Sequence, residues 1–145
     1  MGESLHIVCP HCDGVNRVPA DRLHSQPTCG KCKKNLFDAH PVELGSGNFA
    51  QHIDRNDIPV LVDFWAPWCG PCRMVAPQVE EVARRNAGRV VVVKVNTDVV
   101  QEVAARLGIK SIPTLAVFAG GREAARTSGA MGADQIEAFI QQATR

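Results

Sequence analysis

The segment VLVDFWAPWCGPC, residues 60–72, decides the fold because it joins a strand directly to the start of a helix. Its residues 60–66 form an apolar run rich in β-branched and aromatic side chains, which is typical of a strand. The following residues place apolar side chains at helical spacing and predict a helix over 71–86. The two cysteines, Cys69 and Cys72, therefore lie where a strand ends and a helix begins.

The spacing of these two cysteines favours thiol–disulfide exchange. One thiolate can attack the disulfide of a partner, and the second thiol can then resolve the mixed disulfide. The helix start favours the thiolate form of Cys69, because the backbone dipole stabilises negative charge there. Two alternatives stay open: the cysteines can be inert core thiols, or they can supply half of a metal site.

Periodicity elsewhere predicts alternating strands and helices, and hence an α/β fold with a mixed central sheet and helices on both faces. Residues 90–96 are almost continuously apolar, as expected of a strand buried on both faces. A strand, a helix and a strand of these lengths form a parallel βαβ unit. Asp98 with Gln101 can cap a further helix that stops at Gly108. The remaining predicted elements are a helix over 48–56, a hairpin of residues 114–119 and 123–128 around Gly120-Gly121, and a helix that opens at Asp134 with Glu137.

Four more cysteines form two C-x-x-C pairs in the first 40 residues. Sixteen residues separate these pairs, which is typical of a zinc ribbon. Four thiolates close a tetrahedral site, so the expected ion is structural rather than catalytic. Gly14 and Gly30 are expected to help each cysteine loop turn back. The predicted ligands of one Zn²⁺ ion are Cys9, Cys12, Cys29 and Cys32.

The sequence therefore predicts two domains, a four-cysteine zinc-binding module at residues 1–40 and a compact α/β domain at residues 41–145. So small a module has too little core to fold alone, and metal binding should provide much of its folding free energy. Two disulfides or free thiols remain an alternative to the metal. His11 and His24 are alternative ligands, although four cysteines already complete the set. The other histidines, His52 among them, suggest only surface or packing positions.

Charge and hydropathy disfavour two classes of function, nucleic-acid binding and a membrane-spanning role. The formal net charge is +1, which gives no electrostatic case for binding nucleic acid or an anionic membrane. There is no apolar stretch of the roughly 18 residues that a membrane helix needs, and the start of the chain lacks the apolar core of a signal peptide. We therefore expect a cytoplasmic protein whose thiols stay reduced. A monomer is also expected.

Two parts of the chain resemble thioredoxins. Residues 63–72 (DFWAPWCGPC) are similar to the active-site segment of that family, and residues 112–114 (IPT) are similar to its second substrate-contact loop. The N-terminal cysteines, with residues 16–22 and 36–38, resemble the zinc-binding bacterial subgroup often called thioredoxin 2. The resemblance covers nearly the whole chain and implies a thioredoxin fold with a small N-terminal zinc-ribbon-like module.

This resemblance implies a role for each residue of the redox site. Cys69 is the expected nucleophile, more exposed and lower in pKa, and Cys72 is the resolving thiol. Asp63 is expected to take the proton of Cys72, since a buried thiol resists ionising. Lys94 resembles the family's partner for that carboxylate. From the residues alone, Asp63 can also be a satisfied structural carboxylate and Lys94 a solvated edge charge.

Six further positions resemble substrate contacts of the family. Trp68 offers an amphipathic surface beside the nucleophile, and Pro113 in thioredoxins follows a cis peptide bond. A cis turn there exposes backbone groups that can pair with an extended substrate. Trp65 favours core packing, and Gly129 can also serve backbone geometry alone. The expected substrate-binding residues are Trp68, Gly70, Pro71, Ile112, Pro113 and Gly129.

The leading functional hypothesis is a cytosolic protein-disulfide reductase that acts by dithiol–disulfide exchange. The resemblance implies thioredoxin reductase and disulfide-containing client proteins as partners, with NADPH acting only through the reductase and no organic cofactor bound by this chain. The alternative is a zinc-gated redox sensor or holdase-type binding module, because four zinc thiolates accompany a redox pair. A nucleic-acid surface is disfavoured by the balanced charge of the first 40 residues, whereas docking of protein partners there stays open.

Overall fold

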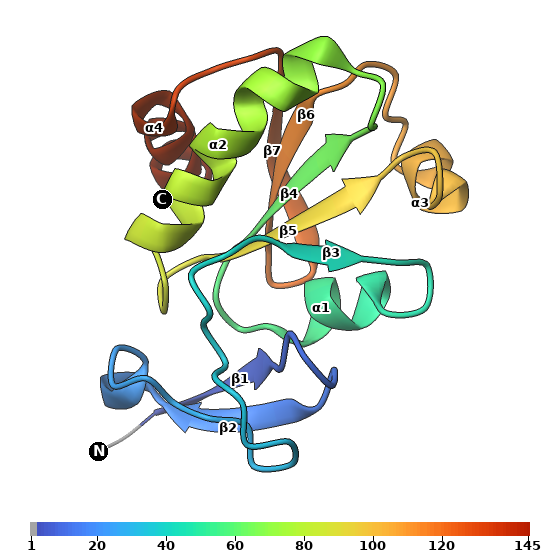
Figure 1. Ribbon diagram of the computed structural model, residues 1–145. Helices are drawn as coiled ribbons and strands as arrows, with labels where there is room; N and C mark the ends of the chain where they lie inside the picture. Colours follow the sequence, from blue (N-terminus) through green and yellow to red (C-terminus); the bar gives the residue numbers. More distant parts are fainter. Residues whose placement is uncertain (1–2) are drawn as a thin grey trace.

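The structure, a computed structural model, describes residues 3–145 and contains two β-sheets (Figure 1). The N-terminal segment, residues 3–40, holds a two-stranded antiparallel sheet and a short 3-10 helix. These elements are β1 (Ser4–Val8), β2 (Val15–Pro19) and η1 (Ala20–Arg22). The four cysteines of this segment lie in the loops that follow β1 and η1.

The second sheet has five strands in the order β3-β5-β4-β6-β7. Its central strand, β4, is parallel to β5 and antiparallel to β6. The bounds of the strands are β3 (Val42–Leu44), β4 (Val60–Trp65), β5 (Val91–Asn96), β6 (Thr114–Ala119) and β7 (Arg122–Ser128). The mixed sheet expected from the sequence is therefore confirmed.

Helices cover both faces of this sheet (Figure 1). They are α1 (Phe49–Arg55), α2 (Gly70–Arg85), α3 (Gln101–Arg106) and α4 (Ala133–Ala143). Side chains of α1 and α3 pack on one face, and those of α2 and α4 on the other. Successive residues of β4 point to opposite faces, so Val60 and Phe64 enter one core while Leu61 enters the other and Asp63 lies under α2. None of the helices within residues 3–145 is long and apolar enough to cross a membrane.

Two of the helix caps expected from the sequence are wrong. Asp98 does not cap α3, which begins without a side-chain cap, because its carboxylate accepts a hydrogen bond from Trp68 Nε1 at 3.1 Å. At the start of α4, Gln135 Oε1 accepts from the Gly132 N–H at 3.0 Å, whereas Glu137 pairs with an arginine of α2. Both acidic side chains find partners that are distant in the sequence and therefore invisible to a local pattern.

Apolar side chains join the N-terminal segment to the five-stranded sheet. Ile7, Val18 and Leu36 form a small core together with Ile58, which lies in the loop before β4. Val91, at the start of β5, packs against the same cluster. The N-terminal segment therefore lies against the N-terminal ends of β4 and β5.

A buried polar contact also links the two parts of the chain. His52 of α1 is 1% exposed, and its Nε2 lies 2.8 Å from Oδ1 of Asp13, in the loop after β1. Asn48 donates to the same oxygen at 3.3 Å, and the hydrogen bond with His52 is the main cause of the lowered pKa of Asp13. Asn56 Oδ1 accepts from the Val8 N–H at 2.9 Å. His52 is thus packed, as expected, but it also has a polar partner that the sequence did not reveal.

Removing the Asp13 carboxylate should weaken the contact between the two parts. Asp13→Ala leaves His52 buried without its partner and places alanine at a φ of 64°, where Gly, Asn and Asp are favoured. We expect the free energy of unfolding to fall by about 1–3 kcal/mol, and Asp13→Asn to lose less. Urea unfolding of the zinc-loaded protein measures both, with Asp21→Asn as the surface control. An Asp13→Ala protein as stable as that control would contradict the expectation.

Candidate functional site

A disulfide joins Cys69 and Cys72 at the first turn of α2, with their Cα atoms 5.2 Å apart. Cys69 is the N-cap residue of this helix, and its Sγ accepts a hydrogen bond from the Cys72 N–H at 3.2 Å. That N–H is one of the donors that a helix start leaves without an internal partner. It therefore favours negative charge on Cys69 Sγ once the disulfide is reduced.

The two cysteines are equally buried. Each is 3% exposed, so the expectation that Cys69 is the more exposed sulfur is wrong for the disulfide form. The reason is packing, because Ala66 and Ile112 lie in the same small apolar cluster as both cysteines. Trp68, by contrast, is 67% exposed.

The loop before β6 faces the disulfide. Its Ile112–Pro113 peptide bond is cis, as the resemblance implies, and the Ile112 carbonyl oxygen lies 3.8 Å from Cys69 Sγ. Gly129 donates its N–H to the Pro113 carbonyl at 3.0 Å and has a φ of 97°, a conformation that favours glycine. The structure thus brings Ile112, Pro113 and Gly129 together beside Cys69.

Three apolar side chains near the redox disulfide are strongly exposed. Trp68 directly precedes Cys69, Met74 follows Cys72 by two residues, and Val99 follows Asp98, which contacts Trp68. Besides Trp68, Met74 near the start of α2 is 71% exposed and Val99 is 70% exposed. Trp68 Nε1 donates to Asp98, the chain neighbour of Val99. Sequence reasoning missed Met74 and Val99. The available signal was that Met74 lies off the apolar stripe of its helix.

Asp63 lies on β4 beneath α2 and is 1% exposed. Its Oδ1 is buried and has no hydrogen-bond partner among residues 3–145. Burial raises the pKa of Asp63 to about 6, while the charge of Lys94 lowers it and that of Glu43 raises it. A carboxyl group in this state can take up or release a proton close to neutral pH.

Lys94 is the register partner of Asp63 on the neighbouring strand β5. Its Nζ lies over the ring of Trp65, 4.6 Å from the centroid, so Lys94 is not a freely solvated edge charge. The indole N–H of Trp65 donates to Glu43, so Trp65 does more than pack in the core. A cavity of about 290 Å³ is lined by Trp65, Cys72 and Lys94. It has room for water, which can carry a proton on the face of the sheet that bears Asp63.

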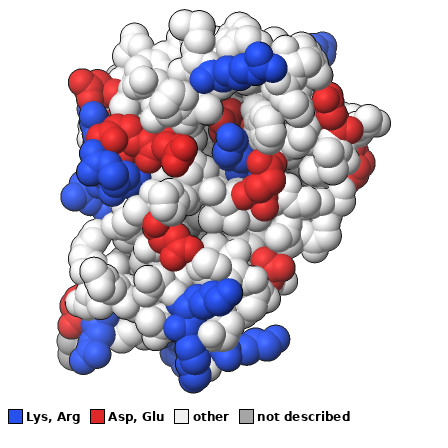
Figure 2. All heavy atoms as spheres, in the orientation of Figure 1, with Lys and Arg blue, Asp and Glu red and all other residues white. Residues whose placement is uncertain are grey.

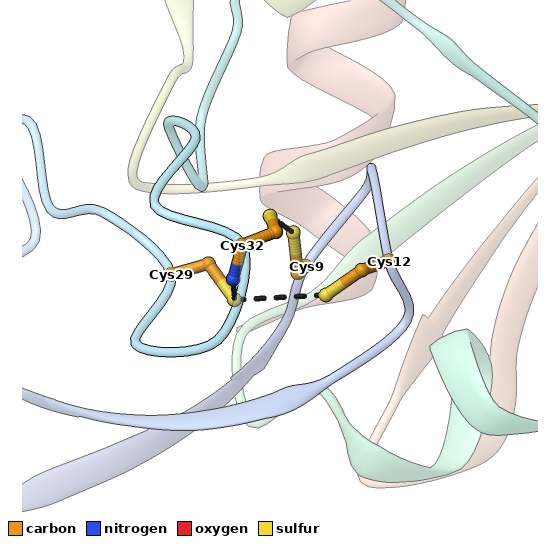
Figure 3. Close-up of side chains that lie close together, drawn as sticks. All are labelled: Cys9, Cys12, Cys29 and Cys32. Atoms are coloured by element: carbon orange, nitrogen blue, oxygen red, sulfur yellow. Dashed lines mark hydrogen bonds between the residues drawn. The ribbon is translucent and has the colours of Figure 1, made fainter.

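The four N-terminal cysteines converge from two loops onto one point (Figure 3). Their sulfur atoms all lie within 4.8 Å of one another. The sulfurs of Cys9 and Cys32 are 3.6 Å apart, and those of Cys12 and Cys29 are 3.7 Å apart. A tetrahedral zinc ion with bonds of about 2.3 Å places its sulfur ligands about 3.8 Å apart. The cluster therefore fits one zinc ion held by four cysteines.

The two cysteine loops repeat the same hydrogen bond. The His11 N–H donates to Cys9 Sγ and the Lys31 N–H donates to Cys29 Sγ, each at 3.3 Å. The side chain of His11 points to Asp38 instead, with Nε2 2.5 Å from its carboxylate. Backbone donors thus support the sulfurs, and the four-residue cluster contains no histidine.

The turns that follow each cysteine pair are not made by glycine. Asp13 and Lys33 have φ values of 64° and 69°, so these two residues, rather than Gly14 and Gly30, adopt the left-handed conformation in the turns. Gly14 instead lies close to a sulfur, because a Cβ there would make a tight contact of 3.3 Å with Cys12 Sγ.

The thiols of the cluster differ in acidity. Hydrogen bonds from the Cys32 N–H and the Asn16 side chain lower the pKa of Cys29 to about 5. Burial raises the pKa of Cys9 to about 12. Zinc binding must displace the remaining thiol protons, so the affinity for zinc falls as the pH falls.

Asp63 should make the stability of the oxidised protein depend on pH. Its pKa in the folded state, about 6, is higher than the value of about 3.9 in an unfolded chain. The folded state therefore binds this proton more tightly than the unfolded chain does. The stability that the protonated carboxyl group of Asp63 contributes below pH ~4 is lost as the pH rises through about 6. The difference of roughly two pH units corresponds to about 3 kcal/mol. Asp63→Asn should remove this loss and be more stable than the wild type above pH ~7 by about that amount.

Urea unfolding of the oxidised protein between pH 4 and 8 measures this effect. Asp21→Asn, an exposed change in the N-terminal segment, is the matched control. Parallel stability curves for the wild type and Asp63→Asn would show that Asp63 has an ordinary pKa.

Comparison with known proteins places these features in one family. The family model Thioredoxin matches residues 40–142, and the model Thioredoxin 2, N-terminal, matches residues 8–34. Thioredoxin C-3 of Corynebacterium nephridii is 40% identical over 136 residues, which cover 94% of this chain and 93% of the relative. Thioredoxin 1 of Nostoc sp. is 53% identical over 89 residues, which cover 61% of this chain and 83% of that protein.

A solved structure of a mutant thioredoxin from Halobacterium salinarum has the same fold. It is 32% identical, matches with a TM-score of 0.66, and covers 74% of this chain and 93% of its own. The larger family match contains the redox disulfide, and the smaller one contains the four-cysteine cluster. The chain therefore belongs to the thioredoxin family of thiol–disulfide oxidoreductases and carries an N-terminal zinc ribbon of the thioredoxin 2 type.

Proposed function

We propose that this chain reduces protein disulfides in the cytoplasm through Cys69 and Cys72. The observation that carries the proposal is the disulfide at the start of α2, opposite the cis turn at Pro113. A sulfur at this position is stabilised as a thiolate, and the second sulfur is within bonding reach. These are the two requirements for repeated dithiol–disulfide exchange.

In the proposed reaction, the Cys69 thiolate attacks one sulfur of the substrate disulfide. A disulfide between Cys69 and the substrate forms, and the first substrate thiolate leaves. The Cys72 thiolate then attacks Cys69 Sγ, which forms the Cys69–Cys72 disulfide and releases the second substrate thiolate. Two electrons thereby pass from the dithiol to the substrate. A thioredoxin reductase that draws on NADPH restores the dithiol.

Asp63 is the proposed acceptor of the proton that Cys72 loses in the second step. It is buried beneath α2, and burial raises its pKa to about 6, so it can accept a proton near neutral pH. Lys94 is its proposed electrostatic partner, and it acts through its charge from a position over Trp65. The cavity beside Cys72 provides room for water along this face.

The substrate is proposed to bind as an extended segment across the two loops. The backbone around Ile112 can pair with such a segment, because its carbonyl lies beside Cys69. Exposed apolar side chains at Trp68, Met74 and Val99 can contact the segment on either side. The proposed substrate-binding residues remain Trp68, Gly70, Pro71, Ile112, Pro113 and Gly129.

Protein clients and a reductase are the proposed partners, rather than nucleic acid or a membrane. The formal net charge is +1. Acidic and basic side chains are interspersed on the face in Figure 2, with Lys and Arg also gathered at the end that the N-terminal segment forms. A phosphate-binding surface requires a continuous basic stripe. We also propose that the protein acts as a monomer.

The zinc site is proposed to be structural, in a domain of residues 1–40 that precedes a thioredoxin domain of residues 41–145. The N-terminal segment packs at the N-terminal ends of β4 and β5, whereas Cys69 follows the C-terminal end of β4 (Figure 1). β4 has six residues and therefore spans about 20 Å. This separation keeps the zinc thiolates out of direct exchange with the redox disulfide. Bound zinc supplies folding free energy to a segment with a small core.

Substitution of each redox cysteine should separate the two steps of the reaction. Cys69→Ser should abolish the reduction of insulin disulfides, because no nucleophile remains. Cys72→Ser keeps the nucleophile but cannot resolve the intermediate, so it should accumulate mixed disulfides that are visible on non-reducing gels. Asp21→Asn should retain wild-type turnover. Full turnover by Cys69→Ser would refute the proposed function.

A zinc-gated redox sensor is the second candidate, because the contact between Asp13 and His52 connects a metal loop to α1. The two candidates differ in their response to an oxidant. If zinc is structural, a peroxide titration should oxidise Cys69 and Cys72 first and leave one zinc ion bound per chain. A zinc-binding dye and thiol mass mapping report both events. Zinc release while Cys69 and Cys72 are still reduced would favour the sensor.

A further inference from the structure

Glu43 lies in a row with Lys94 and Asp63 across three strands. Lys94 on β5 is the register partner of Asp63 on β4 and of Glu43 on β3. Register partners on parallel strands point to the same face, so all three side chains lie on the face that α2 covers. The row places one lysine between two carboxyl groups.

The Glu43 carboxylate is held by two hydrogen bonds. Its Oε2 accepts from Trp65 Nε1 at 3.2 Å and from the Asn96 N–H at 3.0 Å. The ring of the same Trp65 lies 4.6 Å from the Lys94 ammonium. Glu43 therefore fixes the aromatic ring against which Lys94 rests, and it also places a negative charge near that lysine.

Two neighbouring strands bring charged side chains onto the face of Asp63: β5 supplies Lys94, and β3 supplies Glu43. On α2, Cys72 and Arg73 line the cavity beside Lys94. The register partner of Asp63 on β6 is apolar. Burial is the main cause of the raised pKa of Asp63, Lys94 opposes it and Glu43 adds to it. Lys94 and Glu43 are therefore the two opposed charges that act on this carboxyl group.

We propose that Glu43 is a positioning residue for the proton transfer assigned above to Asp63, on which this inference rests. Its charge offsets that of Lys94, and its hydrogen bond to Trp65 keeps Lys94 over the indole ring. Without this charge, Lys94 acts on Asp63 unopposed and favours its ionised form. Glu43 thereby sets the pH range in which Asp63 can accept the proton of Cys72.

Glu43→Gln tests the charge separately from the geometry, because the amide oxygen can still accept from Trp65 and Asn96. An NMR titration of the Asp63 carboxyl carbon in the oxidised, zinc-loaded full chain gives its pKa. We expect this pKa to fall by roughly half a pH unit. Glu80→Gln removes a charge of the same sign from α2, where the Glu80 side chain is 61% exposed, and it should leave the pKa of Asp63 unchanged. An equal pKa in the two variants, or a higher one in Glu43→Gln, overturns the proposal.

The second readout is the pH profile for resolution of a mixed disulfide between Cys69 and a client peptide. In Glu43→Gln this profile should move to lower pH by the same amount as the pKa of Asp63, with the unfolding midpoint unchanged. Asp63→Asn separates this inference from the proposed function. A profile that Asp63→Asn leaves unchanged removes the proton-acceptor role and the role of Glu43 with it. A profile that responds to Asp63→Asn but not to Glu43→Gln overturns the role of Glu43 alone.

Discussion

The hydrogen bond from the Cys72 N–H to Cys69 Sγ is the interaction on which the chemistry of this protein depends. It forms because β4 brings the chain to the start of α2 with Cys69 as the N-cap residue. The unpaired N–H groups and the dipole of the helix start then meet a sulfur that carries charge when reduced. Two apolar cores hold β4 and α2 in place, and the cis turn at Pro113 closes the site from the opposite side.

Asp63 lies at the same β4–α2 junction, where the protein disfavours its negative charge. Its buried oxygen lacks a partner among residues 3–145, so the charged form is disfavoured and the proton is held to higher pH. The thiolate of Cys69 is favoured at the helix start, while the carboxylate of Asp63 is disfavoured beneath it. In the proposed mechanism Cys69 attacks the substrate disulfide and Asp63 receives a proton, and Lys94 and Glu43 are the charges proposed to set the pKa of Asp63. The zinc ribbon lies at the other end of β4 and is tied to the sheet by its own contacts.

The features that the sequence predicted have local signatures. An apolar run followed by a cysteine pair and a helical period predicted the β4–α2 junction, and paired cysteines at ribbon spacing predicted the metal cluster. The features that it missed are side-chain contacts between distant residues. Trp68 contacts a residue 30 positions away and His52 one 39 positions away. No local pattern encodes such pairs, and for the same reason Asp98 was expected to cap a helix. The expectation that Cys69 is the more exposed cysteine was also wrong, because the burial of Cys69 depends on packing against Ile112, which is distant in the sequence.

The ionisation of Cys69 is tested most directly by its rate of alkylation as a function of pH. The reduced, zinc-loaded protein is pulsed with iodoacetamide, and peptide mass mapping separates Cys69 from the other thiols. The hydrogen bond at the helix start predicts a titration midpoint below the value of about 8.5 for an ordinary cysteine. A midpoint at or above that value would contradict the role of the β4–α2 junction in activating this sulfur.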